Sequence, residues 1–527
     1  VQAQVEQIYS DPTNLDYTSS SGQQLQSAIT VIDNETGNLV GIAGRVGEKT
    51  GNLWMNFATD SKRQPGSSIK PLTAYAPALD AGAVSPATTF DNYPVRLLNG
   101  NPWPKNSPNT YTGWTSVRNG VKASINTIAV QTLEKVGVTA AYQFATENLG
   151  LSLAPEDMNV SPLGLGGLTY GLSTVEMAAA YSAFANNGVY NEPKTYVKVL
   201  ANDNTTVVLE NESEQRVAMK ETTAYLMTDM LRRAVNESGG TGGGARFSGM
   251  HIAGKTGTTN DNYDRYFTGY TPYYCAAVWV GYKNNERISY SVNPAASLWR
   301  QVMEKVHADL PDKSFSRPSS GLTTVTVCAD SGMLVTDACR ADPRQNRVVQ
   351  FEVAVGTEPK EECTLHKMVD ICTEGNCLAG EFCPAESIVQ QGYLDYTSGN
   401  PKAFLKLLYR GRRDQTYADL NKVLRIEITE DSPAVEIYNE DGKVGEWDFQ
   451  NLNRVTESDR IFELCRGGGR SRQYLALPKD ALREGTVEEF RSCMDRWLKG
   501  DKTVEYYDIS ERRQKQLMKA KYQLFKH

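Results

Sequence analysis

Residues 66–71 read Gly-Ser-Ser-Ile-Lys-Pro and begin an apolar run that continues to residue 79. Apolar side chains recur in this run at helical spacing, which predicts a buried helix. Ser67 and Lys70 are three residues apart, so both side chains should face the same space. A serine hydroxyl is a weak nucleophile until a base removes its proton, and a desolvated lysine can be that base. The alternative is an ordinary helix start, with a serine cap and a solvated lysine.

The size and composition of the chain limit the class of protein it can be. Its 527 residues are enough for roughly two to four domains. The formal net charge of −7 argues against a general nucleic-acid binder. No apolar run reaches the length of a transmembrane helix. The sequence starts at Val1 rather than at a methionine, and we expect a fragment of a parent protein that is anchored in a membrane.

The order of the predicted elements indicates a large mixed domain. Residues 1–24 are polar and contain a serine-rich stretch, which predicts a flexible linker. Strand patterns at the two ends of residues 25–312, with helices between them, predict one α/β or α+β domain whose sheet joins sequence-distant strands. The strand patterns are residues 25–33, 39–44, 250–259 and 273–282, and the main helix patterns are residues 67–79, 121–136, 140–149, 173–187, 222–235 and 296–310.

Residues 313–395 contain a cysteine repeat. The pairs Cys328–Cys339 and Cys372–Cys383 have the same internal spacing, and the second pair follows the first by 44 residues. Such regularity predicts a small structural unit used twice. We favour disulfides within these two pairs, with Cys363–Cys377 as a weaker third, and hence an oxidising compartment. Zinc is the alternative, although metal knuckles normally use shorter spacings. Cys275 should be a buried free thiol in a strand.

Residues 396–527 differ in character from the rest of the chain. Strand patterns at residues 423–428, 434–438 and 444–449 precede helix patterns at residues 487–498 and 509–525. This order predicts a small α+β domain, whose role the sequence does not indicate. The last helix pattern is basic, which is more typical of a solvated or packing face than of membrane or nucleic-acid contact.

Two further motifs give the serine and lysine a chemical context. Residues 124–126 read Ser-Ile-Asn and residues 255–258 read Lys-Thr-Gly-Thr. In this order, the three motifs resemble those of the penicillin-interacting serine transferases. Residues 63–71, Arg-Gln-Pro-Gly-Ser-Ser-Ile-Lys-Pro, are similar to the nucleophile segment of class A penicillin-binding proteins, and residues 164–171, 177–181 and 254–261 are similar to other stretches of that family. The resemblance covers roughly residues 25–312. The cysteine repeat looks like C-terminal extensions of some clostridial-type members.

The resemblance implies a fold and a reaction. The fold is a β-lactamase/transpeptidase-like antiparallel sheet flanked by helices. The reaction is a D,D-transpeptidation that crosslinks peptidoglycan stem peptides at D-Ala-D-Ala through a serine acyl-enzyme, which β-lactams would trap. It needs no metal or organic cofactor, and it takes place at the extracytoplasmic face of the bacterial membrane. A D,D-carboxypeptidase, a β-lactam-binding sensor and a catalytically silent scaffold are the alternatives. Class A members also carry a glycosyltransferase domain, which we do not find in this sequence.

The motif matches imply a role for each candidate catalytic residue. Ser67 is the nucleophile and Lys70 is the base that takes its proton. Ser124 relays that proton towards the leaving amine, and Lys255 keeps the local field positive, which helps to hold Lys70 neutral. Asn126 holds the backbone amide of the substrate.

The Lys-Thr-Gly-Thr motif supplies the expected substrate-binding residues. The hydroxyl groups of Thr256 and Thr258 suit a terminal carboxylate. Gly257 leaves room for a substrate that lies along the strand. The backbone N–H groups of Ser67 and Thr258 would form the oxyanion hole.

Overall fold

The computed structural model describes residues 1–394, except residues 99–100, 212–213, 290–292, 346, 374–376 and 380–382. Beyond residue 394 it describes only the backbone of strands β19 (Arg425–Thr429), β20 (Ser432–Asn439), β21 (Gly442–Asp448), β22 (Leu452–Thr456), β23 (Ile461–Cys465) and β24 (Arg472–Ala476). The chain divides into two compact units. The first comprises Val1–Thr88, Ser116–Val325 and Phe351–Glu358, and the second comprises Thr89–Thr115, Thr326–Gln350 and Pro359–His527.

A five-stranded antiparallel sheet forms the centre of the first unit. Its strand order is β11-β12-β13-β1-β2, and these strands are β1 (Gln26–Asp33), β2 (Leu39–Ala43), β11 (Ala253–Thr258), β12 (Asp264–Tyr270) and β13 (Tyr274–Gly281). Strand β1 pairs with β13, with Ile29 opposite Val278. The predicted fold class and the closure of the sheet by sequence-distant strands are therefore confirmed. Strand β12 was not predicted, and it lies between the two predicted C-terminal strands.

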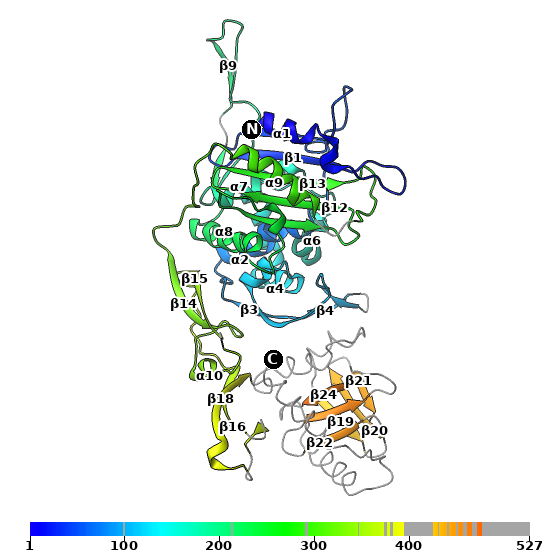
Figure 1. Ribbon diagram of the computed structural model, residues 1–527, viewed down its shortest axis with the longest axis vertical. Helices are drawn as coiled ribbons and strands as arrows, with labels where there is room; N and C mark the ends of the chain where they lie inside the picture. Colours follow the sequence, from blue (N-terminus) through cyan, green and yellow to red (C-terminus); the bar gives the residue numbers. More distant parts are fainter. Residues whose placement is uncertain are drawn as a thin grey trace. The chain divides into compact units, whose positions relative to one another are not determined.

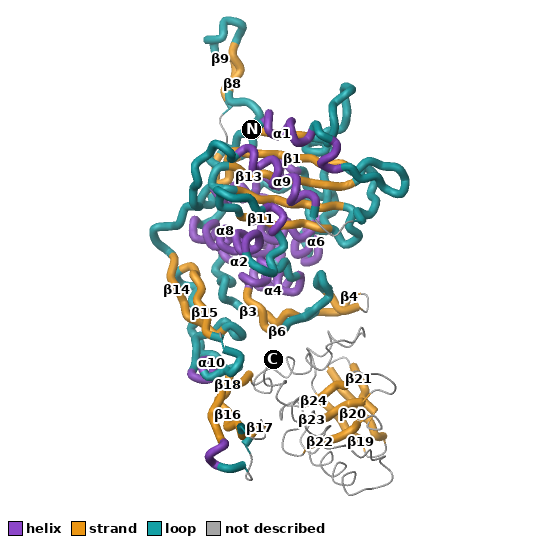
Figure 2. The backbone as a smooth tube through the Cα atoms, viewed as in Figure 1, coloured by secondary structure: helices purple, strands orange, loops and turns teal. Residues whose placement is uncertain are grey.

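Helices cover both faces of this sheet (Figures 1 and 2). Helices α1 (Gln2–Tyr9) and α9 (Pro294–Val306) pack on one face, where Ala276 and Val278 of β13 join Trp299 in a buried core. Helix α7 (Thr174–Ala185) packs against β1, β12 and β13, and its Tyr181 packs against Tyr270. The side chains of β13 alternate between the two faces, so its continuous burial follows from helices on both sides.

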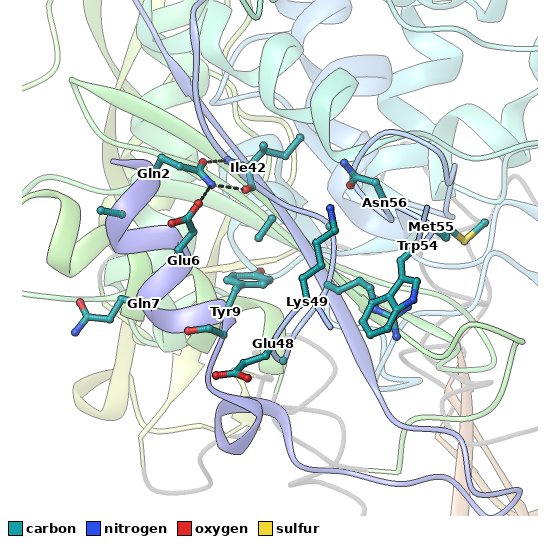
Figure 3. A pocket seen from close by; sticks show the side chains of 16 residues that line it. Gln2, Glu6, Gln7, Tyr9, Ile42, Glu48, Lys49, Trp54, Met55 and Asn56 are labelled. Atoms are coloured by element: carbon teal, nitrogen blue, oxygen red, sulfur yellow. Dashed lines mark hydrogen bonds between the residues drawn. The ribbon is translucent and has the colours of Figure 1, made fainter. Parts of the chain in front are cut away.

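Helix α1 lies in the segment that the sequence suggested was a flexible linker. Val5, Ile8 and Tyr9 are buried in the core beneath α9, so the linker prediction is wrong for these residues. The side-chain amide of Gln2 acts like a neighbouring strand towards β2, as Figure 3 shows. It accepts from the N–H of Ile42 at 2.8 Å and donates to the carbonyl of the same residue at 3.1 Å.

The remaining helices of the first unit follow the predicted patterns with some interruptions. Helix α7 begins with a capping box, in which Ser173 and Glu176 each accept the other's backbone N–H. The pattern at residues 121–136 is not one helix, because the chain turns at Ser124, whose φ is +59°. The helices are α2 (Ala76–Asp80), α3 (Val117–Lys122), α4 (Asn126–Val136), α5 (Val138–Gln143), α6 (Val160–Leu165) and α8 (Glu221–Asn236), with short hairpin strands β7 (Val189–Asn191), β8 (Lys198–Leu200), β9 (Val207–Glu210) and β10 (Gln215–Val217).

The described part of the second unit consists mainly of short paired strands. Strand β14 (Leu322–Cys328), which begins in the first unit, pairs with β15 (Val348–Ala354), which ends in the first unit. Strand β16 (His366–Cys372) pairs with β17 (Cys377–Leu378) and β18 (Ile388–Leu394). Helix α10 (Asp337–Arg340) follows β14. Three short strands β3 (Thr89–Asn92), β4 (Arg96–Leu98) and β5 (Asn101–Trp103) precede β6 (Gly113–Ser116). Strands β19, β20 and β21 correspond to the three strand patterns predicted after residue 420.

The two favoured disulfides are not formed among the residues that the structure describes. No disulfide joins Cys328 to Cys339, or Cys372 to Cys383, in the described part of the chain. Cys275 is a buried free thiol in β13, as predicted. The side chain of Cys377 and the helix patterns at residues 487–498 and 509–525 lie outside the described residues. The two-fold repeat stays a prediction. Among the residues that the structure describes, none of the helices has both the length and the apolar character of a membrane span.

Candidate active site

The serine of the 66–71 stretch lies on a short 3-10 helix, η2 (Gly66–Ile69). Side chains three residues apart eclipse one another in a 3-10 helix, which places Ser67 and Lys70 on one side. The N–H of Lys70 donates to the carbonyl of Ser67. Pro71 has no N–H with which to continue an α-helical ladder, and a π turn, η3 (Pro71–Tyr75), follows. Ser67 is partly exposed, whereas Lys70 is fully buried.

Two glycines allow η2 to approach β11 directly. Gly66 has a φ of +52°, and a Cβ atom there would lie 2.5 Å from the carbonyl oxygen of Thr258. A Cβ atom on Gly257 would lie 2.1 Å from the carbonyl oxygen of Pro65. Neither position can hold a larger side chain unless the backbone moves. The segment that carries Ser67 is therefore in backbone contact with the strand that carries Lys255.

The turn between α3 and α4, at Ser124, is hydrogen-bonded both to Lys70, which follows η2, and to Lys255 of β11. The amine of Lys70 donates to the backbone carbonyl of Ser124 at 3.0 Å and to Oδ1 of Asn126 at 2.5 Å. The amine of Lys255 donates to the hydroxyl oxygen of Ser124 at 2.7 Å. A non-glycine residue at positive φ is uncommon and marks a constrained position. The turn at Ser124 presents its carbonyl to one lysine and its hydroxyl to the other.

The two lysines share a buried, electropositive environment. Neither has any exposed surface, and the described hydrogen bonds of both amines go to uncharged oxygens. Burial lowers the pKa of Lys70 well below its ordinary value, and the charge of nearby Lys255 lowers that pKa further. Burial lowers the pKa of Lys255 to about 7. Both effects favour the neutral amine of Lys70, which is the state a general base needs.

The remaining predicted site residues lie along β11. Thr256 and Thr258 are partly exposed, and Gly257 between them is buried. Two partners of these threonines were not predicted. Thr256 donates its hydroxyl to Thr241 Oγ1 at 2.9 Å, and Arg265 donates to the hydroxyl of Thr258 at 3.0 Å. Thr241 lies in the glycine-rich stretch of residues 238–244.

Arg265 lies on β12, directly opposite Thr258. It brings a guanidinium group to the end of the Lys-Thr-Gly-Thr motif, where a carboxylate would be attracted. Recognising β12 as a strand paired with β11 would have placed Arg265 opposite Thr258, but this strand was not predicted from the sequence. Tyr181, which was noted only as part of a family-like stretch, donates its hydroxyl to the carbonyl of Ser68 and so fixes η2 from the α7 side.

A pocket of about 730 Å³ lies elsewhere in the first unit (Figure 3). Its walls come from α1, from β2 and from the loop that follows β2, and they include Glu6, Lys49 and Trp54. None of the predicted site residues lines it. The groups with the chemistry expected of a catalytic site are instead those around Ser67.

The model of the penicillin-binding protein transpeptidase domain matches residues 27–304 of this chain. The chain belongs to the penicillin-binding protein transpeptidase family. Residues 318–368 match the model of the C-terminal domain of penicillin-binding protein 1A. The first match contains every predicted site residue, and the second contains Cys328, Cys339 and Cys363. The chain therefore carries the transpeptidase domain of a class A penicillin-binding protein.

Similar sequences carry the same family name. Penicillin-binding protein 1A of Clostridium botulinum (strain Hall) is 35% identical over 397 residues, which cover 73% of this chain and 47% of that protein. Penicillin-binding protein 1A/1B of Bacillus subtilis (strain 168) is 36% identical over 318 residues, which cover 56% of this chain and 34% of that protein. The chain thus spans about half the length, or less, of these relatives.

Solved structures of penicillin-binding proteins share the fold. Penicillin-binding protein 1A from Haemophilus influenzae has a TM-score of 0.54 at 22% identity, over 65% of this chain and 55% of that one. The penicillin-binding protein PonA1 from Mycobacterium tuberculosis has a TM-score of 0.52 at 22% identity, over 60% of this chain and 86% of that one. At 22% identity these similarities show a shared fold.

Proposed function

We propose that this chain is a D,D-transpeptidase that crosslinks peptidoglycan stem peptides at D-Ala-D-Ala through an acyl-enzyme on Ser67. The observation that carries the proposal is the contact of two buried lysines with one turn beside that serine. Lys70 and Lys255 reach different atoms of Ser124 at 3.0 and 2.7 Å. Such an arrangement suits the movement of a proton between a serine nucleophile and a leaving amine.

Lys70 would act as the general base for acylation. A neutral amine has two N–H groups and one lone pair. Both N–H groups have acceptors, in the carbonyl of Ser124 and Oδ1 of Asn126. The lone pair is then left for the proton of Ser67, which lies on the same side of η2. Ser67 Oγ attacks the carbonyl carbon of the penultimate D-Ala, and the backbone N–H groups of Ser67 and Thr258 would stabilise the oxyanion.

Ser124 would carry the proton to the leaving group. Because Lys255 donates to the hydroxyl oxygen of Ser124, the proton of that hydroxyl must point elsewhere. It can pass to the amine nitrogen of the departing D-Ala while Lys70 returns a proton to Ser124. The C–N bond breaks, the acyl group stays on Ser67, and free D-Ala leaves. The positive charge on Lys255 would favour the neutral form of Lys70 during this step.

The substrate would lie along β11. This strand is at one edge of the sheet, so an extended peptide can join it as a further strand. Thr256, Thr258 and the guanidinium of Arg265 would bind the terminal carboxylate. Asn126 would hold the backbone amide of the substrate by a hydrogen bond. Attack on the acyl-enzyme by the amine of a second stem peptide then completes the crosslink, at the extracytoplasmic face where peptidoglycan lies.

Labelling with a fluorescent penicillin tests the nucleophile. We expect the wild-type chain to form a covalent adduct, Ser67→Ala to form none, and Ser20→Ala, an exposed serine outside the site, to label like the wild type. Mapping the adduct to another residue, or an unlabelled wild-type chain, would refute the acyl-enzyme on Ser67.

A second assay distinguishes the possible fates of the acyl-enzyme. The purified chain is incubated with stem peptides that end in D-Ala-D-Ala and carry an acceptor amine, and products are weighed by mass spectrometry. Crosslinked dimers support the transpeptidase. Trimmed monomers alone indicate a D,D-carboxypeptidase. A chain that binds one equivalent of penicillin but changes no peptide would be a sensor.

A further inference from the structure

Three cysteines and one histidine of the second unit meet at a single point. Cys328 ends β14, Cys339 lies in α10, Cys363 lies in the loop before β16, and His366 begins β16. All four side chains are buried. Their three sulfur atoms and one imidazole nitrogen all lie within 4.8 Å of one another. They are the ligand types that zinc prefers, in the number that fills a tetrahedral shell.

The spacing of these atoms fits a metal better than a disulfide. His366 Nδ1 lies 3.4 Å from the sulfur of Cys328 and 3.4 Å from the sulfur of Cys363. Tetrahedral zinc with ordinary zinc–sulfur and zinc–nitrogen distances places sulfur and nitrogen ligands about 3.6 Å apart. No disulfide joins any of these three cysteines in the described residues. These two separations are close to those expected in a tetrahedral site.

The surroundings of His366 set the tautomer that a metal requires. Its Nε2 lies 3.0 Å from a carboxylate oxygen of Asp342, and a carboxylate accepts only from a protonated nitrogen. In a neutral imidazole Nδ1 is then unprotonated, and it faces the sulfurs of Cys328 and Cys363. A metal-bound histidine almost always donates its other N–H to such an oxygen. Arg344 in turn donates to Asp342 at 2.6 Å and holds that carboxylate in place.

The sulfur atoms also have donors around them. The backbone N–H of Ser331 points to the sulfur of Cys328 at 3.5 Å, and the hydroxyl of Thr336 lies 3.3 Å from the sulfur of Cys339. Hydrogen bonds of this kind stabilise negative charge on sulfur, which a coordinating thiolate carries. The structure therefore supplies both the ligands and the groups that orient them.

A second set of ligand types, Asp330, Asp342 and His366, adjoins the first. The guanidinium of Arg344 donates to both of these carboxylates, at 2.8 and 2.6 Å. A fixed positive charge in that position opposes a cation there. This second set therefore serves to orient His366, and the sulfur-rich set remains as the place for a metal.

We propose that Cys328, Cys339, Cys363 and His366 bind one structural zinc ion in the second unit. Three thiolates and one imidazole leave no open position for a substrate, so the site is structural and not catalytic. Soft thiolate ligands in a tetrahedral set select zinc over magnesium or calcium. The ion joins β14, α10 and the start of β16. This part of the chain, whose described strands are short, would depend on the ion for stability.

The metal content of the full chain tests this proposal. The chain is produced in zinc-supplemented medium and purified with reductant and without chelator, and metals are measured by plasma mass spectrometry. We expect about one zinc per chain. Cys363→Ser should lower zinc to background, whereas Cys383→Ser, a matched change outside the four ligands, should retain it. Far-ultraviolet circular dichroism shows whether each variant is folded.

A measurement on the wild-type chain avoids dependence on variants. Zinc is removed with a chelator under reducing conditions and replaced by cobalt(II). We expect thiolate-to-cobalt charge-transfer absorption and the intense visible bands of a tetrahedral site. Wild-type protein without bound zinc, with weak octahedral cobalt bands, would overturn the proposal. So would a Cys328–Cys339 disulfide found by non-reducing peptide mapping of protein purified without reductant.

Discussion

The amine of Lys255 lies 2.7 Å from the hydroxyl oxygen of Ser124, although the two residues are 131 positions apart in sequence. This hydrogen bond fixes the orientation of the Ser124 hydroxyl, because the oxygen is already an acceptor. The proton of Ser124 must therefore be directed away from Lys255, and in the proposed mechanism it passes to the leaving amine. A proton relay through Ser124 makes its removal a direct test of the proposed mechanism.

We expect Ser124→Ala to slow acylation by β-lactams without preventing the chain from folding. A positioned acid–base group contributes about 10²–10⁴-fold to a rate, and we expect a loss in this range in the second-order rate constant for labelling by a fluorescent penicillin. Ser20→Ala is the control. A Ser124→Ala rate equal to that of the wild type would show that protons reach the leaving group by another route.

The rate of acylation should depend on pH through both lysines, because Lys70 must be neutral and Lys255 must be charged. The pKa of Lys70 is lowered by burial and by Lys255, so the base is lost only when the pH falls below that lowered value. The pKa of Lys255 is about 7, so its positive charge is lost as the pH rises through 7. We expect the labelling rate to fall on both sides of an optimum.

The variant Lys255→Arg separates these two effects, because arginine remains charged across this range. Its labelling rate will be lower overall, since the geometry differs, but the decrease on the alkaline side should move to higher pH. If the labelling rate of Lys255→Arg falls at the same alkaline pH as that of the wild type, a group other than Lys255 causes the decrease.

Gly66→Ala should disrupt the contact between the nucleophile turn and β11. Alanine at positive φ costs about 1–2 kcal/mol, and its Cβ would also lie 2.5 Å from the carbonyl oxygen of Thr258. Gly47→Ala is the matched control, because Gly47 has a φ of +93° and nothing within 4 Å of its Cβ position. We expect Gly66→Ala to lower the free energy of urea unfolding more than Gly47→Ala, and it alone should lose penicillin labelling. Equal effects would contradict a role of this contact.

Helix α1 should contribute to the stability of the transpeptidase domain. Val5 has no exposed surface and lies in the core beneath α9. We expect Val5→Ala to lower the free energy of unfolding by about 1–3 kcal/mol, since it removes buried methyl groups and leaves a cavity. Gln7→Ala, on the exposed side of the same helix, should change it little. The urea midpoint of each variant measures the difference.

Two local features of the candidate site could be predicted from short motifs. The three-residue spacing of Ser67 and Lys70 placed both on one side of a helical turn, and residues 255–258 were expected at the end of a strand. The turn at Ser124 was harder to foresee, because its positive φ is held by hydrogen bonds to two distant lysines. Arg265 was missed together with β12, since residues 264–270 lack the clear alternation of a half-buried strand.

Segments whose structure depends on distant partners were predicted least well. Helix α1 lies in a polar segment of the sequence, and its apolar residues find their core only through α9 and β2. The cysteines were paired from their spacing along the chain. That spacing does not reveal that Cys363 and His366 return to the same point as Cys328 and Cys339, because folding of β14 and β16 brings them together.

The two edge strands of the central sheet differ in whether other parts of the described chain bind to them. The edge at β2 is occupied by the amide of Gln2 at Ile42 and by the backbone of Lys194 at Leu39. The opposite edge, at β11, pairs with no further strand in the described chain. A peptidomimetic inhibitor built as an extended strand would therefore have one side of this sheet to join. An acidic group placed near the serine end of such an inhibitor would face the guanidinium of Arg265, a contact that does not depend on a reactive β-lactam ring.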